Sequence, residues 1–444
     1  MSPSDSILPY LPRALVRSVF RTRATETLQA TVLCADIVGF TQLSRQLSRQ
    51  AKEGSEELTA ILNRYFEGLI DTIGAYSGDI LLFGGDALTA AFDGEDHAGR
   101  AARCGLEVQR AMDRSGRIET SQGTFTLGLH VGISSGELQL TRVGGRDRRH
   151  LLIRGGMLKS LCAARDASDV GEVIVSDSTV QLLGDDAGVT PCAKSPKLYR
   201  LTEVHDLPGS WTSPHSRPSV DADVSRALRA YLPQQLRDRV GTGSLEEGEH
   251  RPVAIVFIRY SDIVDTDFGT LFETMDACIE SYGGTLVRDD FTEGGPRLLV
   301  LFGAPVGTED AAFQAVRCAV DLNEVTSTHD PAIGFRTAIS YGQVFAGKVG
   351  SETRKEYTVI GEPSTWLHAW LNGRNHSKFS LTTLSTRAST EGWIQKPRSP
   401  SWPKGLRRRS RLSGFCTQDH RQNQEPVSTG SLVVRPKSGG CVRC

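Results

Sequence analysis

The chain has 444 residues, 39% of them apolar and 23% charged, and a formal net charge of −1 at pH 7. This length suits two or three domains, and the apolar content suffices for packed cores. The apolar runs are far shorter than the ~20 residues of a membrane-spanning helix, and the first residues lack the apolar core of a signal peptide. The composition therefore excludes a transmembrane protein, and we expect a cytoplasmic protein that does not associate with membranes.

The first predicted elements alternate between strands and helices. After an N-terminal segment (residues 1–26), an apolar strand is predicted over 31–37, followed by an amphipathic helix with Ser55 as its N-cap. A hairpin is predicted around the glycine pair of "GDILLFGGDALTAAF" (78–92), then a second helix, then a strand that ends in a tight turn at "GISSGEL" (132–138). The residues expected on the buried face of the first helix are Leu58, Ile61, Leu62, Tyr65, Leu69 and Ile73.

The chain then repeats this order of elements. Residues 95–109 and 309–323 share six identical positions in fifteen, and "YLPRALVR" (10–17) is echoed by "YLPQQLRD" (231–238). A strand over 253–259 and a turn in "AISYGQV" (338–344) take the corresponding places. One domain used twice is the simplest explanation. We predict an α+β fold with mixed sheets covered by helices. The predicted division of the chain is a first domain over 27–204, a linker over 205–250 and a second, truncated domain over 251–363.

The C-terminal residues differ in kind from the rest. From Ser364 onward there are 14 Lys or Arg against 3 Asp or Glu, so this tail carries about +11 and the preceding part about −12. Four of the five tryptophans lie in the tail, and no helical or strand period orders its apolar residues. We expect residues 364–444 to be a disordered basic tail.

Two stretches concentrate residues that could carry chemistry. "VLCADIVGFTQLS" (32–44) places Asp36 at the end of an apolar strand, before a turn at Gly39 whose backbone N–H groups could face an anion. The hairpin places Asp86 at its tip. Two carboxylates from neighbouring strand ends suit a pair of magnesium ions that hold a triphosphate. Taken singly, each aspartate could equally be a helix cap or a turn residue.

Together with the duplication, three motifs carry a family resemblance: "ADIVGFTQLS", "GDILLFGGDALTAAF" and "EYTVIGEP". Over about residues 8–363 the chain resembles the class III adenylate/guanylate cyclases, in particular the bacterial and soluble-adenylyl-cyclase-like proteins with two cyclase homology domains in tandem. The resemblance implies two ferredoxin-like domains that pair within the chain around one composite site for ATP or GTP. It also implies that Asp36 and Asp86 bind two Mg²⁺ or Mn²⁺ ions. The second copy lacks these carboxylates, since it has Arg259 or Tyr260 near the place of Asp36 and "EGGPR" in place of "FGGDA".

The resemblance assigns further positions to the nucleotide. The family's adenine-reading lysine, four residues before the second aspartate, falls on Leu82, and its threonine partner is retained as Thr358. A phosphate-binding lysine corresponds to His130, for which an ordinary strand histidine is the alternative. The full set of predicted nucleotide-binding residues is Ile37, Val38, Gly39, Phe40, Thr41, Leu82, His130 and Thr358.

The two residues expected to be catalytic are missing. After "YTVIG" the family continues to an asparagine that orients the ribose and an arginine that stabilises the transition state, and these positions fall on Thr365 and Ala369. Codons permitted for "STWLHAW" (364–370), read one base out of register, spell Asn-Leu-Ala-x-Arg. We therefore interpret the tail as out-of-frame translation.

Three hypotheses for function remain. The first is a nucleotidyl cyclase of intracellular signalling that converts ATP, or as a second choice GTP, to cyclic nucleotide and pyrophosphate, with impaired activity in this chain. The second is a catalytically dead cyclase pair that acts as a nucleotide-sensing regulatory module. The third is binding of nucleic acid or an acidic membrane through "GLRRRSR" (405–411), for which a solvated tail is the simpler interpretation.

Overall fold

We analysed a computed structural model of the chain. It describes residues 7–21, 23–47, 51–145, 147–205, 222–242, 248–260, 268–329, 335–361 and 430–434. We refer to residues 7–205 as the first half and to residues 222–361 as the second half.

The first half is built on a β-α-β-β-α-β unit. Its strands follow the spatial order β2-β3-β1-β6, and all three pairings are antiparallel. This is the ferredoxin-like order, in which the two helical connections place the first and third strands at the centre. The unit consists of β1 (Thr25–Val38), α2 (Phe40–Leu47), α3 (Ala51–Ala75), β2 (Asp79–Phe83), β3 (Ala87–Asp93), α4 (His97–Ser115) and β6 (Gly128–Gly144).

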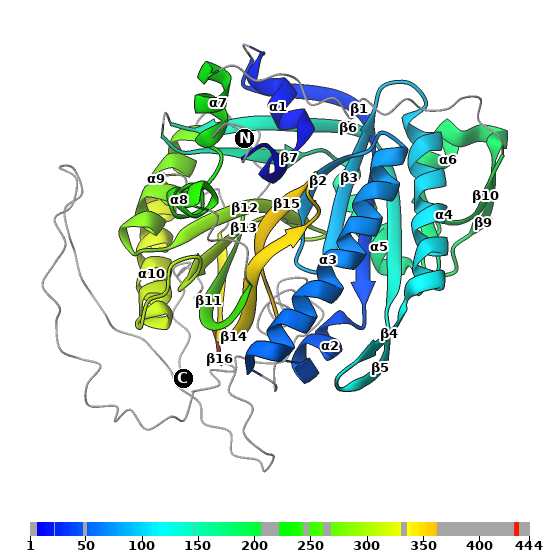
Figure 1. Cartoon of the computed structure of the whole chain (residues 1–444). Coiled ribbons are helices and arrows are strands. Elements are labelled where there is room, and N and C mark those ends of the chain that lie inside the picture. The colour runs from blue at the N-terminus through cyan, green and yellow to red at the C-terminus, as the bar shows by residue number, and fades with distance from the viewer. Residues whose placement is uncertain are drawn as a thin grey trace, which may run out of the picture.

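Further elements extend this sheet beyond β6. β8 pairs with β6 in parallel and leads to β10 and β9, while β7 forms a long hairpin with β6. A small hairpin of β4 and β5 stands apart (Figure 1). These elements are β4 (Arg117–Thr120), β5 (Gly123–Thr126), β7 (Arg149–Arg154), α5 (Met157–Ala167), β8 (Val173–Ser176), α6 (Asp177–Leu183), η3 (Gly184–Asp186), β9 (Ala187–Pro191) and β10 (Leu198–Val204).

The second half has the same unit. Its strands follow the order β12-β13-β11-β14-β15, again with antiparallel pairing throughout. The elements are β11 (Glu249–Arg259), α9 (Phe268–Ser281), β12 (Thr285–Thr292), β13 (Gly295–Phe302), α10 (Ala311–His329), β14 (Arg336–Gly350) and β15 (Lys355–Ile360). The short strand β16 (Gly430–Val434) pairs with β14 on the edge away from β11.

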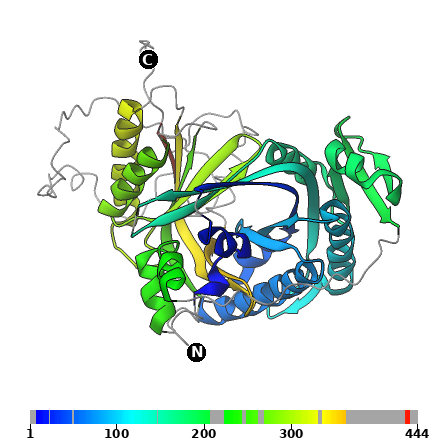
Figure 2. The same ribbon diagram turned by 90° about the horizontal axis from the view of Figure 1, so that it is seen from above.

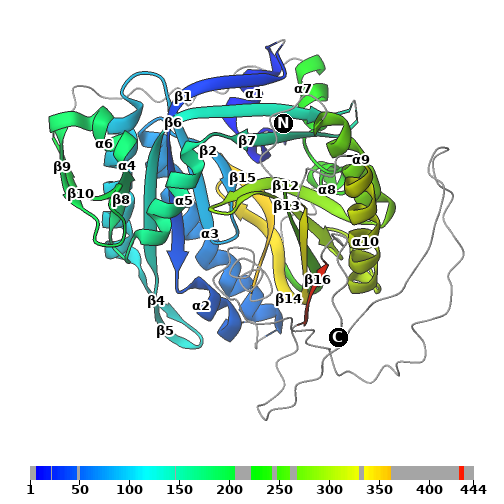
Figure 3. The ribbon, with the colours of Figure 1, turned by 180° about the vertical axis from the view of Figure 1, so that it is seen from behind.

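Both faces of each central strand are buried. In β1, Leu33 and Ala35 face the cluster formed with α3 and α4, while Val32 and Cys34 face a second cluster on the other side of the sheet. Because successive side chains of a strand point to opposite faces, one uninterrupted apolar run serves both clusters. α5 lies over the second face, between the two halves (Figure 3).

The two halves exchange contacts in a reciprocal way. α3 of the first half packs on β14 of the second half, and α9 of the second half packs on β6 of the first half. Consequently α3 and α4 lie on one side of the molecule, and α9 and α10 lie on the other (Figures 1 and 3). The side chain of Arg148 donates to the carbonyl of Leu286 at 2.6 Å, and Arg354 donates to the carbonyl of Ile80 at 3.1 Å. The same contact is therefore made twice, once in each direction.

Short helices connect the ends of the two halves. η1 (Leu8–Tyr10) and α1 (Arg13–Val19) form an apolar cluster with residues of α7 (Ala222–Arg229) and of the turn before α8 (Gln234–Thr242). The two repeated "YLP" segments thus meet. Seen from above (Figure 2), the N-terminal helix, in dark blue, lies over the centre of the molecule.

The structure confirms the α+β class, and the six helix residues predicted to face the core are all buried. Three local predictions are wrong. Ser55 lies inside α3 rather than at its N-cap, because the helix begins at Ala51 through residues that favour helix. The predicted turns in "GISSGEL" and "AISYGQV" do not occur, because β6 and β14 continue past Gly136 and Gly342 while they stay paired to β1 and β11.

Other predictions fall partly outside the described residues. The predicted linker over 205–250 contains α7 and α8, and these helices pack against the two halves. Of the tail expected over 364–444, only residues 430–434 are described, and they differ from the expectation because they form a strand on β14. Among the residues that the structure describes, no helix is both long and apolar enough to span a membrane.

Candidate functional site

The candidate site begins with Asp36, two residues before the end of β1. Asp36 is half-buried and lies on the same face of the strand as Cys34, towards α5. The chain then turns at Gly39, where φ is +90°, and enters α2 at Phe40. A Cβ at residue 39 would lie 3.0 Å from the carbonyl oxygen of Thr126, so both the conformation and the available space require glycine there.

The second carboxylate is held close to the first by backbone contacts. Asp86 follows the glycine pair in the β2–β3 hairpin, and its carbonyl oxygen accepts a hydrogen bond from the N–H of Ile37 at 3.1 Å. The residue after it, Ala87, pairs with Asp36 across β3 and β1. The predicted approach of Asp36 and Asp86 therefore follows from the pairing of β1 with β3 and from the hairpin that joins β2 to β3.

Burial disfavours ionisation of both carboxylates, and the charge of Asp36 also disfavours ionisation of Asp86. Burial raises the pKa of Asp86 to about 8, and the nearby charge of Asp36 contributes to this shift. Burial also raises the pKa of Asp36, while Arg165 and His130 oppose the shift. Paired carboxylates in a poorly hydrated site carry excess negative charge, which a cation relieves.

One positive charge near the two carboxylates comes from a side chain of the protein, and it was not predicted from the sequence. Arg165, on α5, donates to Asp166 at 2.8 Å and lowers the pKa of both Asp36 and Cys34 by its charge. Burial alone would lower the pKa of Arg165, but the neighbouring thiols and carboxylates raise it. α5 approaches the sheet this closely because β6 has Gly132, where a Cβ would lie 2.3 Å from the backbone nitrogen of Arg165. The sequence around residue 132 does not predict this contact.

His130 lies beside the carboxylates. It is the cross-strand neighbour of Asp36 in the pairing of β6 with β1, so the two side chains share a face. Its Nδ1 atom is buried without a hydrogen-bond partner. The structure thus brings His130 to the site, and its assignment to a phosphate stays a prediction.

The expected group of backbone N–H donors is smaller than predicted. The N–H of Ile37 is used by the carbonyl of Asp86, so it cannot face an anion. Val38 is the last residue of β1 and is paired with Gly128 of β6. The other predicted donors belong to Gly39, Phe40 and Thr41, at the start of α2, where helical N–H groups lack partners within the helix.

Strand register identifies the counterparts of these residues in the second half. Phe92 faces Thr31 and Phe302 faces Ala254, and each phenylalanine is one of the last two residues of the third strand of its unit. This alignment makes Arg259 the counterpart of Asp36. It decides between the two residues that the sequence left open.

The same register makes Pro296 the counterpart of Asp86. Neither Arg259 nor Pro296 offers a carboxylate, so only the first half presents the pair.

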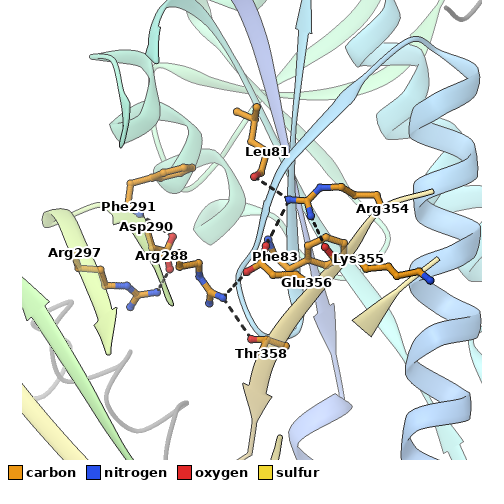
Figure 4. Close-up of polar contacts among 10 residues, drawn as sticks. All are labelled: Leu81, Phe83, Arg288, Asp290, Phe291, Arg297, Arg354, Lys355, Glu356 and Thr358. Atoms are coloured by element: carbon orange, nitrogen blue, oxygen red, sulfur yellow. Dashed lines mark hydrogen bonds and ion pairs between the residues drawn. The ribbon is translucent and has the colours of Figure 1, made fainter. Parts of the chain in front are cut away.

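The second half instead presents a polar group at a different position. The guanidinium of Arg288, on β12, lies 2.9 Å from Glu356 and donates to the hydroxyl oxygen of Thr358 at 3.4 Å, as Figure 4 shows. Thr358 is fully buried on β15. A guanidinium and a hydroxyl together can donate to and accept from a planar ligand edge.

The residue that corresponds to Arg288 in the first half is Leu82. Both β2 and β12 contain a register shift at the same place, between Ile80 and Leu82 and between Leu286 and Arg288. The sequence prediction located the base-reading position on Leu82 by counting back from Asp86. In the second half that count misses Arg288, because the hairpin there is longer. Aligning "DILLF" (79–83) with "TLVRD" (285–289) would have found it.

The first half therefore lacks the polar pair that the second half has. Leu82 is buried in an apolar cluster with Leu158, Leu161 and Phe291. The counterpart of Thr358 is Leu152, which is also buried. At the position of Leu82 and Leu152, these two side chains would offer no hydrogen bonds to polar groups of a ligand.

The two predicted catalytic positions, Thr365 and Ala369, lie outside the described residues, as does the side chain of Thr41.

The donor set fits a divalent cation. Asp36 and Asp86 offer carboxylate oxygens on adjoining strands, and their mutual repulsion would be relieved by a cation. Within the described part of the chain, no group of three or more His, Cys, Asp or Glu residues could hold a metal ion. Two carboxylates would therefore need additional oxygen ligands, such as the phosphates of a bound molecule.

Comparisons with known proteins identify a cyclase catalytic domain in the first half. Residues 22–196 match the family model described as the adenylate and guanylate cyclase catalytic domain. The chain is 23% identical over 404 residues to rabbit (Oryctolagus cuniculus) adenylate cyclase type 10, which covers 80% of this chain and 24% of that protein. It is 28% identical over 148 residues to adenylate cyclase 1 of Rhizobium meliloti, covering 31% of this chain and 21% of that protein. Residues 22–196 therefore form a catalytic domain of the class III adenylate/guanylate cyclase family.

One solved structure shares the fold over both halves. A class III adenylyl cyclase-like ATP-binding protein from Pseudomonas aeruginosa superposes with a TM-score of 0.54 over 83% of this chain and 89% of that chain, at 12% identity. At this identity the likeness concerns the fold alone. The chain spans about a quarter of the length of the curated adenylate cyclase type 10 proteins that it matches.

Proposed function

We propose that the chain is a nucleotidyl cyclase-type protein whose two halves are cyclase homology domains that pair within one chain and form a single composite site for ATP. One observation carries this proposal. The first half has Asp36 and Asp86 where the second has Arg259 and Pro296, whereas the second half has a polar pair where the first half has two leucines. Neither half is complete, and each supplies what the other lacks.

The roles of the residues follow from their chemistry. Asp36 and Asp86 would hold Mg²⁺ or Mn²⁺, taken as two ions by family resemblance. When bound, the ions would neutralise the phosphates and lower the pKa of the ribose 3′-hydroxyl, whose oxygen displaces pyrophosphate from the α-phosphorus. The free N–H groups at the start of α2 would bind phosphate oxygens, and His130 would add a donor beside them.

The polar pair favours adenine over guanine. Arg288 only donates hydrogen bonds, and the hydroxyl of Thr358 can accept one, which matches the N1 acceptor and the N6 donor of adenine. Guanine presents adjacent N1–H and N2–H donors and needs two acceptors. The nearest carboxylate, Glu356, already accepts from Arg288 and from the N–H of Phe83. GTP is therefore the weaker substrate in this proposal.

Activity in this chain would be low. Positions 365 and 369 carry threonine and alanine, which cannot orient a ribose or offset charge on the phosphates. This observation supports the second candidate function, a catalytically impaired pair that binds nucleotide as a regulatory module. In both candidates the chain binds ATP with a divalent metal ion.

The test is calorimetric titration of the full chain with ATP, with and without Mn²⁺. We expect one weak site, strengthened by Mn²⁺, and loss of the Mn²⁺-dependent part in Asp36→Ala but not in Asp71→Ala, a matched change at an exposed residue of α3. Arg288→Met should weaken ATP binding and leave binding of inorganic triphosphate unchanged. Two equivalent sites, or equal effects of Asp36→Ala and Asp71→Ala, would refute the composite site.

A further inference from the structure

The carboxylate of Glu356 touches both parts of the composite site. Glu356 lies on β15 of the second half, with its side chain only 16% exposed. One oxygen, Oε1, accepts from Arg288 Nη1 at 2.9 Å. The other, Oε2, accepts from the backbone N–H of Phe83 at 3.2 Å, as Figure 4 shows. A single rigid group therefore contacts the base-reading arginine and a strand of the opposite half.

The contact with Phe83 depends on the position of the hairpin that carries Asp86. Phe83 is the last residue of β2, three positions before Asp86. Its ring is fully buried, packs edge-on against Phe66 at 5.2 Å between ring centroids, and lies under the guanidinium of Arg354 at 5.2 Å. Because the ring is fixed, the direction of the Phe83 N–H is fixed as well, and it orients the Glu356 carboxylate.

The contact with Glu356 restricts the side chain of Arg288. An arginine side chain has several rotatable bonds, and ordering it costs rotamer entropy. The bond to Glu356 holds the guanidinium where it also reaches the hydroxyl of Thr358 at 3.4 Å. An arginine released from Glu356 would lose this preorganised position.

The corresponding position of the first half has no such link. The counterpart of Glu356 on β7 is His150, whose Nε2 is hydrogen-bonded to Asp276 at 3.0 Å. The His150 ring packs at a tilted angle against Phe272 of α9. Among the described residues, the link is therefore seen once, between Arg288 and the backbone N–H of Phe83.

We infer that Glu356 is a positioning residue that couples nucleobase recognition by Arg288 to metal and phosphate binding at the Asp36–Asp86 hairpin. The inference deepens the proposed function and rests on it. When the hairpin takes up metal and phosphate, it orients the Glu356 carboxylate through Phe83, and the carboxylate in turn fixes Arg288. Coupling of this kind is reciprocal and is measured as a ratio of affinities.

The test uses Glu356→Gln in the full chain. Glutamine keeps the shape but offers one acceptor and one donor in place of two acceptors, so one of the two contacts must break. The matched control is Glu352→Gln, because the Glu352 side chain is 89% exposed and its ion pair is with Lys355, the first residue of β15, at 2.8 Å.

Four titrations measure the coupling in each protein: ATP and inorganic triphosphate, each with and without Mn²⁺. The coupling factor is the ATP-over-triphosphate affinity ratio with Mn²⁺ divided by the same ratio without Mn²⁺. We expect a factor of at least about five in the original chain and in Glu352→Gln, and about one in Glu356→Gln. Hydrogen exchange at the Phe83 amide, or at the adjoining peptide of β2, should be at least tenfold faster in Glu356→Gln than in the control.

Each outcome decides the inference. A coupling factor in Glu356→Gln equal to that of the control overturns it. So does a parallel loss of ATP and triphosphate affinity with a lowered unfolding temperature, because that pattern indicates a purely structural role. Metal-dependent ATP binding with a factor of one in the original chain overturns the inference alone. A chain that binds neither ATP nor triphosphate overturns the proposed function and this inference with it.

Discussion

The raised pKa of Asp86 predicts that metal affinity depends steeply on pH. Below about pH 8 this carboxyl group holds a proton in the folded, metal-free chain, because burial and the charge of Asp36 disfavour its ionised form. A divalent cation binds the carboxylate, so it must displace that proton. The apparent affinity for Mn²⁺ should therefore rise about tenfold from pH 6 to pH 7, about fivefold from pH 7 to pH 8, and little above that.

The same pKa shift has the opposite sign for the stability of the metal-free chain. The folded state holds a proton that the unfolded state releases near its ordinary pKa of about 4. The stabilisation from Asp86 is fully present below that pH and is lost as the pH rises through about 8. Raising the pH in this window should lower the unfolding temperature without metal and increase the rise in unfolding temperature that Mn²⁺ causes.

The assay is titration of Mn²⁺ alone into the full chain at several pH values from 6 to 8.5, by calorimetry and thermal unfolding. His130 also faces Asp36 across β1 and β6, and Arg165 contributes a positive charge. His130→Gln separates the two groups, because a slope that persists in this variant belongs to the carboxylates. Affinity independent of pH from 6 to 8, or a slope abolished by His130→Gln, would refute the reasoning.

Two further predictions concern the interface and catalysis. Arg354→Met should destabilise the chain by about 2–4 kcal/mol, because it leaves the carbonyls of Ile80 and Leu81 without their donor, whereas Arg17→Met at an exposed ion pair should cost under about 1 kcal/mol. Urea unfolding measures both, and equal effects would contradict the role of Arg354. Restoring the reading frame, so that asparagine and arginine return at positions 365 and 369, should raise cyclic AMP formation from ATP with Mn²⁺ at least a hundredfold. Robust turnover by the unrepaired chain would contradict this, and no turnover by either would favour the regulatory candidate.

Much of the fold could be predicted because it depends on local patterns. The spacing of apolar residues over 58–73 determines the buried face of α3, since a helix brings every third and fourth residue to one side. The repeat between 95–109 and 309–323 indicates the same unit twice, and both stretches run into the long helices α4 and α10. Asp36 and Asp86 could be named for the same reason: each stands beside an apolar strand and a glycine turn that local residues specify.

The polar half of the site depends on tertiary structure. The sequence does not distinguish Arg288 from other arginines. The register shift in β12 aligns it with Leu82, and the fold brings its guanidinium to the hydroxyl of Thr358 on β15. Arg165 reaches Asp36 only because Gly132 lets α5 approach the sheet. These contacts join residues distant in the chain, and no local preference encodes them.

Strand length shows the same division. The sequence alone determined that an apolar strand runs through 31–37, because its residues favour a doubly buried strand. Only the tertiary structure decided that β1 begins at Thr25 and that β6 continues past Gly136, since each strand extends as far as the other offers hydrogen-bonding partners. Side-chain periodicity is local, whereas the register between strands and the pairing of the two halves are set by partners far away in the chain. For that reason the sequence determined the carboxylates, and the tertiary structure decided which residues complete their site.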